Sequence, residues 1–231
     1  MVAGANANCY LGEENCKLIN DYCDQGYTYF MAGTASCQGE GNPCDMKTKY
    51  CNAADKPSAC NMARSSATKA NCLNSDLKTL RSQAVKRTNE LRAKHGLPGL
   101  KEDNCINEMA QAYAEKLAAA GGSLQHSSKK DSAYLGENLA GGWASNGVGD
   151  LNGADPVQGW YDEIKDWDFS TSSGKGTGDT GHFTQVVWKA TTKVGHGFAA
   201  TSDCNRFVVV GNYDVAGNMR GEYAANVPPL Q

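Results

Sequence analysis

The chain of 231 residues has little net charge and lacks any long apolar run. Its formal net charge of -3 provides no strong electrostatic attraction to nucleic acid or to an anionic membrane surface. No stretch is long enough and apolar enough to cross a bilayer as a helix. The composition therefore predicts neither a nucleic-acid-binding protein nor a membrane-spanning one.

Valine, leucine and isoleucine are scarce in the first 72 residues, where they occur only at positions 2, 11, 18 and 19. A segment with so few core-forming side chains needs covalent crosslinks to fold. It also lacks the Cys-x-x-Cys pairs that would favour a zinc ribbon. The same segment contains eight of the ten cysteines, namely Cys9, Cys16, Cys23, Cys37, Cys44, Cys51, Cys60 and Cys72. We therefore predict a disulfide-rich module over residues 1–74 of a secreted protein, with Met1 standing where a signal peptide has been removed.

Residues 75–231 contain all four tryptophans and enough apolar residues for a second domain. Apolar residues at helical spacing predict helices over about 77–95, 106–120 and 157–164. Short apolar runs predict strands over 183–188, 194–200 and 207–213, the first of them covered on both faces. Between the third helix and the first strand, the glycine- and serine-rich residues 170–181 indicate a mobile loop.

Two cysteines, Cys105 and Cys204, lie outside the amino-terminal segment. The eight cysteines of the amino-terminal segment are an even number and can pair among themselves. We therefore expect the remaining two to bond to each other. The alternative is that each bonds to a cysteine of the amino-terminal module. His95 lies at the end of the first predicted helix, where we expect it to complement the carbonyl end.

Five motifs in the second domain resemble those of one known family. The first is Gly-His-Phe-Thr-Gln-Val-Val-Trp at 181–188. The others are Leu-Gln-His-Ser at 124–127, Gly-Glu-Asn-Leu-Ala at 136–140, Trp-Tyr-Asp-Glu at 160–163 and Gly-Asn-Tyr-Asp-Val-Ala-Gly-Asn at 211–218. Together they resemble the CAP superfamily of cysteine-rich secretory proteins, antigen 5 and pathogenesis-related proteins. Residues 221–227 are similar to the fungal, pathogen-related-in-yeast branch, whereas residues 1–74 resemble no family that we can name.

The resemblance implies a three-layer α-β-α sandwich of the α/β class, with a small antiparallel sheet, over residues 75–231. It also implies a central cavity lined by His126, Glu137, Glu163 and His182. Two neutral imidazoles and two carboxylates suit zinc or another divalent cation, with the carboxylates as direct or water-mediated ligands. With only two nitrogen ligands, such a site would be open and exchangeable.

Residues 160–181 resemble the sterol-binding loop of the fungal branch. Wide aromatic rings on an adjustable loop suit a flat, apolar ligand. The resemblance therefore implies that Tyr161, Trp167 and Phe169 bind a sterol or a fatty-acid-like lipid, with Trp160 in the core. Two cysteines usual in the family are absent, one at Gly211 and one near His196, so the carboxy-terminal sheet lacks crosslinks there.

Two other functions remain open from the sequence. One is an extracellular effector of virulence or defence that binds a host or cell-surface protein and keeps only a vestigial cavity. The other is a zinc-dependent protease, with Glu137 or Glu163 as the base. Because the chain has neither a His-Glu-x-x-His nor a Gly-x-Ser-x-Gly motif, we assign no catalytic residue and favour a binding protein.

Overall fold

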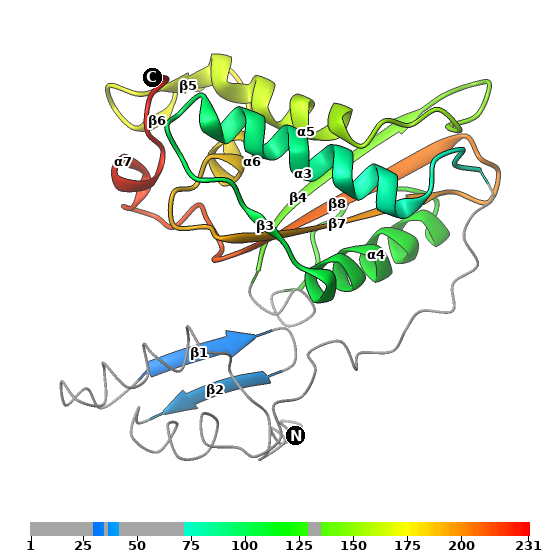
Figure 1. The fold of residues 1–231 in the computed structure, drawn as a ribbon, viewed down its shortest axis with the longest axis horizontal. Helices are drawn as coiled ribbons and strands as arrows, with labels where there is room; N and C mark the ends of the chain where they lie inside the picture. Colours follow the sequence, from blue (N-terminus) through cyan, green and yellow to red (C-terminus); the bar gives the residue numbers. More distant parts are fainter. Residues whose placement is uncertain (1–29, 35–36, 42–71, 129–134) are drawn as a thin grey trace. The chain divides into compact units, whose positions relative to one another are not determined.

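The computed structural model describes residues 30–34, 37–41, 72–128 and 135–231 (Figure 1). The chain divides into two units, residues 1–64 with 128–134 and residues 65–127 with 135–231. In the first unit, β1 (Phe30–Thr34) pairs antiparallel with β2 (Cys37–Gly41). The remainder of the predicted disulfide-rich module lies outside the described residues.

The second unit is built on a four-stranded sheet in the order β3-β7-β8-β4. Its three long strands, β4 (Gly136–Trp143), β7 (Lys193–Ala200) and β8 (Arg206–Asp214), are antiparallel. The two-residue β3 (Lys101–Glu102) runs parallel to β7. Helices α3 (Leu77–Ala93) and α5 (Ala154–Tyr161) lie over one face and α4 (Asn104–Ala119) over the other, which confirms the three-layer fold (Figure 1).

Shorter elements complete this unit. A 3-10 helix, η2 (Asp162–Asp166), continues α5 and leads into the small hairpin of β5 (Trp167–Asp168) and β6 (Ser173–Gly174). Helix α6 (Gly181–Val186) follows, and α7 (Tyr223–Asn226) lies near the carboxyl end. No helix in the described part of the chain has the length and hydropathy needed to span a membrane.

An aspartate caps each of the first two helices, and the cap at Asp76 confirms the predicted start of the first. The Asp76 carboxylate accepts a hydrogen bond from the Thr79 amide, and Asp103 accepts from the amides of Cys105 and Ile106. An aspartate at this position satisfies backbone donors that a helix leaves unpaired at its amino end. The short polar side chain therefore determines where each helix begins.

The predicted strand at 183–188 is wrong, because this segment forms α6 and the turn that follows it. Every residue from Phe183 to Trp188 is buried. A short apolar run buried on all sides has the same appearance in a strand as in a helix, so periodicity alone does not separate the two. The helix is selected by a distant group, since the Glu163 carboxylate accepts from the amides of His182 and Phe183 at its amino end.

The predicted bond between Cys105 and Cys204 is also wrong. Cys204 is bonded to Cys72, 132 residues away in the sequence. Cys105 is disulfide-bonded as well, to a cysteine other than Cys204. Cys72 lies within residues 1–74, so for Cys204 the structure shows the alternative, a bond to a cysteine counted with the amino-terminal module.

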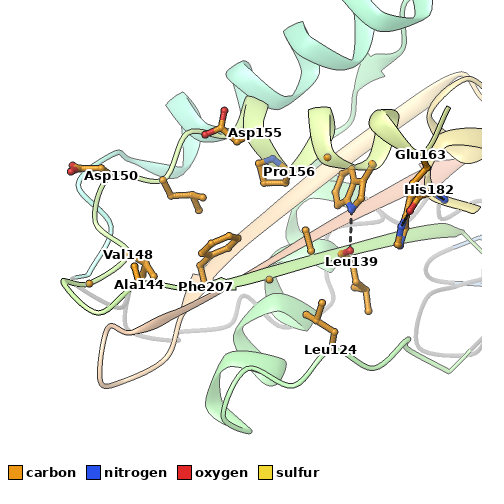
Figure 2. Close-up of a pocket in the computed structure, with 16 residues that line it drawn as sticks. Leu124, Leu139, Ala144, Val148, Asp150, Asp155, Pro156, Glu163, His182 and Phe207 are labelled. Atoms are coloured by element: carbon orange, nitrogen blue, oxygen red, sulfur yellow. Dashed lines mark hydrogen bonds and ion pairs between the residues drawn. The ribbon is translucent and has the colours of Figure 1, made fainter. Parts of the chain in front are cut away.

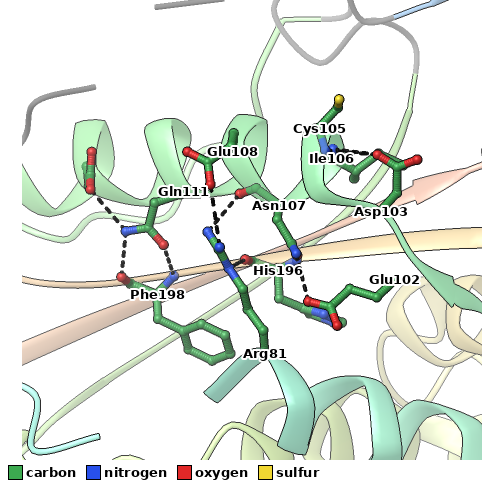
Figure 3. Close-up of polar contacts among 11 residues, drawn as sticks. Arg81, Glu102, Asp103, Cys105, Ile106, Asn107, Glu108, Gln111, His196 and Phe198 are labelled. Atoms are coloured by element: carbon green, nitrogen blue, oxygen red, sulfur yellow. Dashed lines mark hydrogen bonds and ion pairs between the residues drawn. The ribbon is translucent and has the colours of Figure 1, made fainter. Parts of the chain in front are cut away.

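Side chains from two helices cover the outer edge of β7, where the short β3 ends (Figure 3). The Asn107 side-chain oxygen accepts from the His196 amide at 2.8 Å. Gln111 accepts from the Phe198 amide and donates to the Phe198 carbonyl oxygen. Arg81 of α3 donates to the His196 carbonyl oxygen at 2.9 Å. These bonds replace a neighbouring strand and prevent the edge from pairing with another chain.

Two glycines of β7 allow α4 to approach the sheet closely. A Cβ atom at Gly197 would lie 2.3 Å from the backbone of Ala110, and one at Gly195 would lie 2.3 Å from the Asn107 nitrogen. Real side chains do not tolerate such distances to backbone atoms. The hydrogen bonds of Asn107 and Gln111 with the backbone of β7 therefore depend on the absence of side chains at these two positions.

We predict that Gly197→Ala lowers the free energy of unfolding by roughly 1–3 kcal/mol or more, because α4 must move away from β7. Gly159→Ala is the matched control, since a Cβ atom there meets nothing within 4 Å. Alanine is the better helix former, so this control should stabilise α5 slightly. Urea unfolding of both variants tests the prediction, and equal stability of the two would contradict it.

Candidate functional site

Glu163 of η2 binds both the ring and the backbone of His182. Its carboxylate accepts from His182 Nδ1 at 2.6 Å, from the His182 amide at 2.9 Å and from the Phe183 amide at 3.1 Å. Burial opposes ionisation of Glu163, but these hydrogen bonds outweigh it and hold the pKa of the carboxyl below its ordinary value. Because Nδ1 donates to the carboxylate, the neutral ring presents its lone pair at Nε2.

His126 and Glu137 form a second pair of the same kind. His126 lies on the segment after α4, and its Nδ1 is 2.7 Å from a carboxylate oxygen of Glu137 on β4. Ser127 donates to the same carboxylate through its amide and its hydroxyl. The Glu137 side chain is 7% exposed and that of His126 is 63% exposed, so a buried carboxylate orients an accessible imidazole.

The two pairs meet at a polar pocket of about 300 Å³. Three of the four predicted metal-site residues, His126, Glu137 and His182, line it, and Glu163 lies behind His182. No group of three or more histidine, cysteine or acidic side chains in the described ranges is arranged to hold a metal ion. The pocket therefore offers two imidazole nitrogens oriented by carboxylates, and any further ligands of a cation would come from water or from another molecule.

A second and larger cavity of about 670 Å³ lies between α5 and β4 (Figure 2). Its walls are mostly apolar and include Leu139, Ala140, Val148, Pro156, Trp160 and Phe207. We call this cavity the groove. The sequence analysis did not predict this groove. Its glycines at 141, 147 and 159 could have indicated a cavity, because small residues leave space between packed elements.

Trp160 forms one wall of the groove and belongs to the core, as predicted. Its side chain is 3% exposed in total, and its indole nitrogen donates to the Leu139 carbonyl oxygen at 2.9 Å. The indole lies between two histidine rings, with centroids 6.3 Å from His182 and 6.4 Å from His196. The same tryptophan thus connects α5 to the edge strand β4 and positions His182 by ring contact.

The aromatic residues predicted to bind lipid lie away from the groove. Tyr161 and Trp167 are buried in the main core, and Phe169 is half-buried against it. The Tyr161 hydroxyl contacts His95 Nε2 at 2.8 Å, and the centroid of the Trp167 ring lies 5.5 Å from that of the tilted Tyr223 ring. Lipid contact by these three residues stays a prediction, and in this structure their rings pack against the protein itself.

The expected role of His95 at the end of its helix is wrong. His95 is buried, and its Nδ1 contacts the Pro228 carbonyl oxygen at 2.7 Å while Nε2 contacts Tyr161. Burial lowers the pKa of this histidine. The ring therefore connects α3 to the carboxy-terminal segment and to α5 and does not act as a cationic helix cap.

His196 is the most deeply buried histidine and is not a ligand candidate, in agreement with its omission from the predicted site. Burial lowers its pKa from 6.5 to about 3. Neither ring nitrogen has a hydrogen-bond partner among the residues that the structure describes. The residue opposite it on β8 is Gly211, where a Cβ atom would lie 3.0 Å from the Trp160 ring. The two positions where the resemblance implies cysteines are thus filled by a stacked imidazole and a glycine.

Comparison with known proteins identifies the family. The model of the cysteine-rich secretory protein family, CAP, matches residues 85–213. The chain belongs to this family. All four residues of the predicted tetrad lie within the matched range, as do His196 and Gly211.

Curated CAP relatives support the predicted fungal resemblance. The chain is 42% identical over 154 residues to Golgi-associated plant pathogenesis-related protein 1 of Homo sapiens, covering 66% of this chain and 94% of that protein. It is 42% identical over 137 residues to secreted protein RBT4 of Candida albicans and 36% identical over 147 residues to protein PRY2 of Saccharomyces cerevisiae. These matches cover 58% and 63% of this chain but only 34% and 40% of the two yeast proteins.

A solved structure shares the CAP fold. The crystal structure of NaASP2 with Zn²⁺ matches with a TM-score of 0.50 and 22% identity, covering 70% of this chain and 89% of that one. At this identity the likeness shows the fold alone. The layered arrangement and the order of the elements are thus those of a CAP domain.

We predict that His196→Leu reduces the acid sensitivity of the fold. The unfolded chain protonates His196 below about pH 6.5, whereas the folded chain keeps it neutral down to about pH 3. The free energy of unfolding therefore falls as pH decreases through this window, by roughly 3 kcal/mol at pH 4. Urea unfolding at pH 7 and pH 4 measures the difference. A pH dependence that is the same in the parent and in His196→Leu would show that the ring does not titrate in this way.

Proposed function

We propose that this CAP protein is a secreted protein that binds a sterol or a related small apolar lipid in the groove between α5 and β4. The supporting observation is the groove itself. Its volume of about 670 Å³ falls within the range of roughly 300–1,000 Å³ that is usual for small-molecule sites. Its walls are mainly aliphatic and aromatic.

The groove is proposed as the lipid site because it is accessible to a ligand. The loop aromatics Tyr161 and Trp167 are buried and would have to leave the core to contact a ligand, whereas the groove is already open. An apolar ligand there would cover the exposed glycines at 141 and 159 and the ring of Phe207. Secretion is supported by the names of relatives, among them secreted protein RBT4.

We further propose that His126 and His182 bind a divalent cation such as zinc. Each imidazole has its Nδ1 on a carboxylate, which orients Nε2 as a neutral ligand atom. Two nitrogen donors without a thiolate fit a weakly held, exchangeable ion. Such an ion would supply a positive charge to a pocket whose acidic lining residues are Glu137 and Asp179. NaASP2, a protein of the same fold, is described with Zn²⁺.

Catalysis is the less favoured function for a specific reason. The carboxylates of Glu137 and Glu163 already accept hydrogen bonds from Ser127 and from α6. These contacts suit the orientation of an imidazole better than the activation of a water molecule. We therefore assign the tetrad to binding.

Removal of both imidazoles should abolish zinc binding. We predict no titration heat for the variant His126→Ala/His182→Ala, because both ligand nitrogens are lost. Glu163→Gln retains both imidazoles but removes the charge behind His182, and it should weaken binding by about 10- to 100-fold. Calorimetry with ZnCl₂ provides the measurement. Parent-like binding by the double variant would place the ion elsewhere.

Filling the groove should prevent lipid binding. Gly159 lines the groove from α5, and a Cβ atom there meets nothing within 4 Å, so Gly159→Trp is chosen to place a ring in the groove. We predict that saturable binding of radiolabelled ergosterol weakens at least tenfold, about 1.4 kcal/mol. Gly159→Ala is the control and should bind like the parent.

Two outcomes would contradict this proposal. Failure of the parent protein to bind ergosterol or cholesterol saturably would reject the sterol ligand. Binding that is unaffected by Gly159→Trp would place the ligand elsewhere, and loss of binding in Phe169→Ala would then move it to the loop predicted from the sequence.

A further inference from the structure

The groove and the polar pocket meet at one side chain. His182 lines both cavities, and Glu163 lies behind it on the groove side. Figure 2 shows His182 and Glu163 together at one end of the groove, with Asp150 at the opposite end. A single molecule can therefore occupy the apolar groove and place a polar group beside His182.

The charges around both cavities have one sign. Asp150, Asp155 and Glu163 line the groove, and Glu137 and Asp179 line the polar pocket. No lysine or arginine among the described residues lines either cavity. An anionic head group would lose its hydration without gaining a cationic partner and would be repelled by the carboxylates.

The hydrogen-bonding groups at the junction also favour one kind of ligand. His182 Nδ1 donates to Glu163, so the neutral ring has only an acceptor left at Nε2. A hydroxyl group can donate to this nitrogen, whereas a carboxylate or phosphate dianion has no proton to donate. An ammonium group can donate too. However, both oxygens of Glu163 already accept bonds from α6, which leaves this carboxylate a poor counter-ion.

We propose that, when no cation is bound to His182, the groove and the polar pocket form one site for a neutral lipid alcohol. The apolar body lies between α5 and β4, the hydroxyl donates to His182 Nε2, and the acidic lining excludes fatty acids and other anionic lipids. This inference rests on the proposed lipid-binding function and specifies the head group that the site accepts. A sterol and a long-chain alcohol share this chemistry.

Three probes with the same chain and different head groups test the inference. Tritiated dodecan-1-ol, dodecanoate and dodecylamine are titrated against the full chain in buffer with EDTA, so that no metal ion bridges the protein and the head group. We expect dodecan-1-ol to bind at least tenfold more tightly than dodecanoate and more tightly than dodecylamine. Equal or tighter binding of dodecanoate overturns the inference, and tighter binding of dodecylamine replaces it with a cation site.

Two variants test the position of the head group. His182→Phe keeps a ring but removes the Nε2 acceptor, and it should weaken dodecan-1-ol binding about tenfold. Asp179→Lys places a cation in the exposed wall of the polar pocket and should strengthen dodecanoate binding about tenfold. Glu90→Lys makes the same change in net charge on the exposed side of α3 and should alter neither affinity.

The outcomes separate this inference from the proposed function. If no probe binds the parent, or if Gly159→Trp binds every probe as the parent does, the groove is not a lipid site and both proposals fail. If the probes bind and Gly159→Trp prevents it, the function holds. In that case, parent-like affinities in both His182→Phe and Asp179→Lys overturn the head-group inference alone.

Discussion

The hydrogen bonds that Glu163 accepts from the amino end of α6 are the interaction on which the candidate site depends. One carboxylate binds the His182 ring, the His182 amide and the Phe183 amide, and so joins η2 to α6. The free backbone donors and partial positive charge of a helix amino end stabilise an ionised carboxylate. This local arrangement orients the imidazole that both the groove and the polar pocket share.

The two edges of the sheet are completed in different ways. The side chains of Asn107, Gln111 and Arg81 form hydrogen bonds with the backbone groups of β7. The glycines of β7 let α4 approach closely enough for Asn107 and Gln111 to form these bonds. At the opposite edge, the Trp160 indole nitrogen donates a hydrogen bond to the Leu139 carbonyl oxygen, and the space beside β4 remains open as the groove. The fold thus seals one edge with polar side chains and uses the other to build a binding site.

Trp160 and His196 pack together where the resemblance to the family implies crosslinking cysteines. The imidazole of His196 stacks against Trp160 at an interplanar angle of 14° and stands opposite Gly211. A stacked ring with unpaired nitrogens costs stability when it is protonated, whereas a disulfide would not titrate. The wall of the groove is therefore supported by packing that depends on a neutral histidine.

The sequence by itself determined the family, the layered fold, the start of the first helix after Asp76, and the strands β7 and β8, because caps, periodicity and ordered motifs are local signals. It also identified the histidines and carboxylates of the tetrad. Only the tertiary structure decided that residues 181–186 form a helix, that Cys72 bonds to Cys204, and that Tyr161 and Trp167 are buried. It also revealed the groove. Each of these depends on contacts between residues far apart in the chain, such as Glu163 with α6, and no local pattern encodes which distant group arrives.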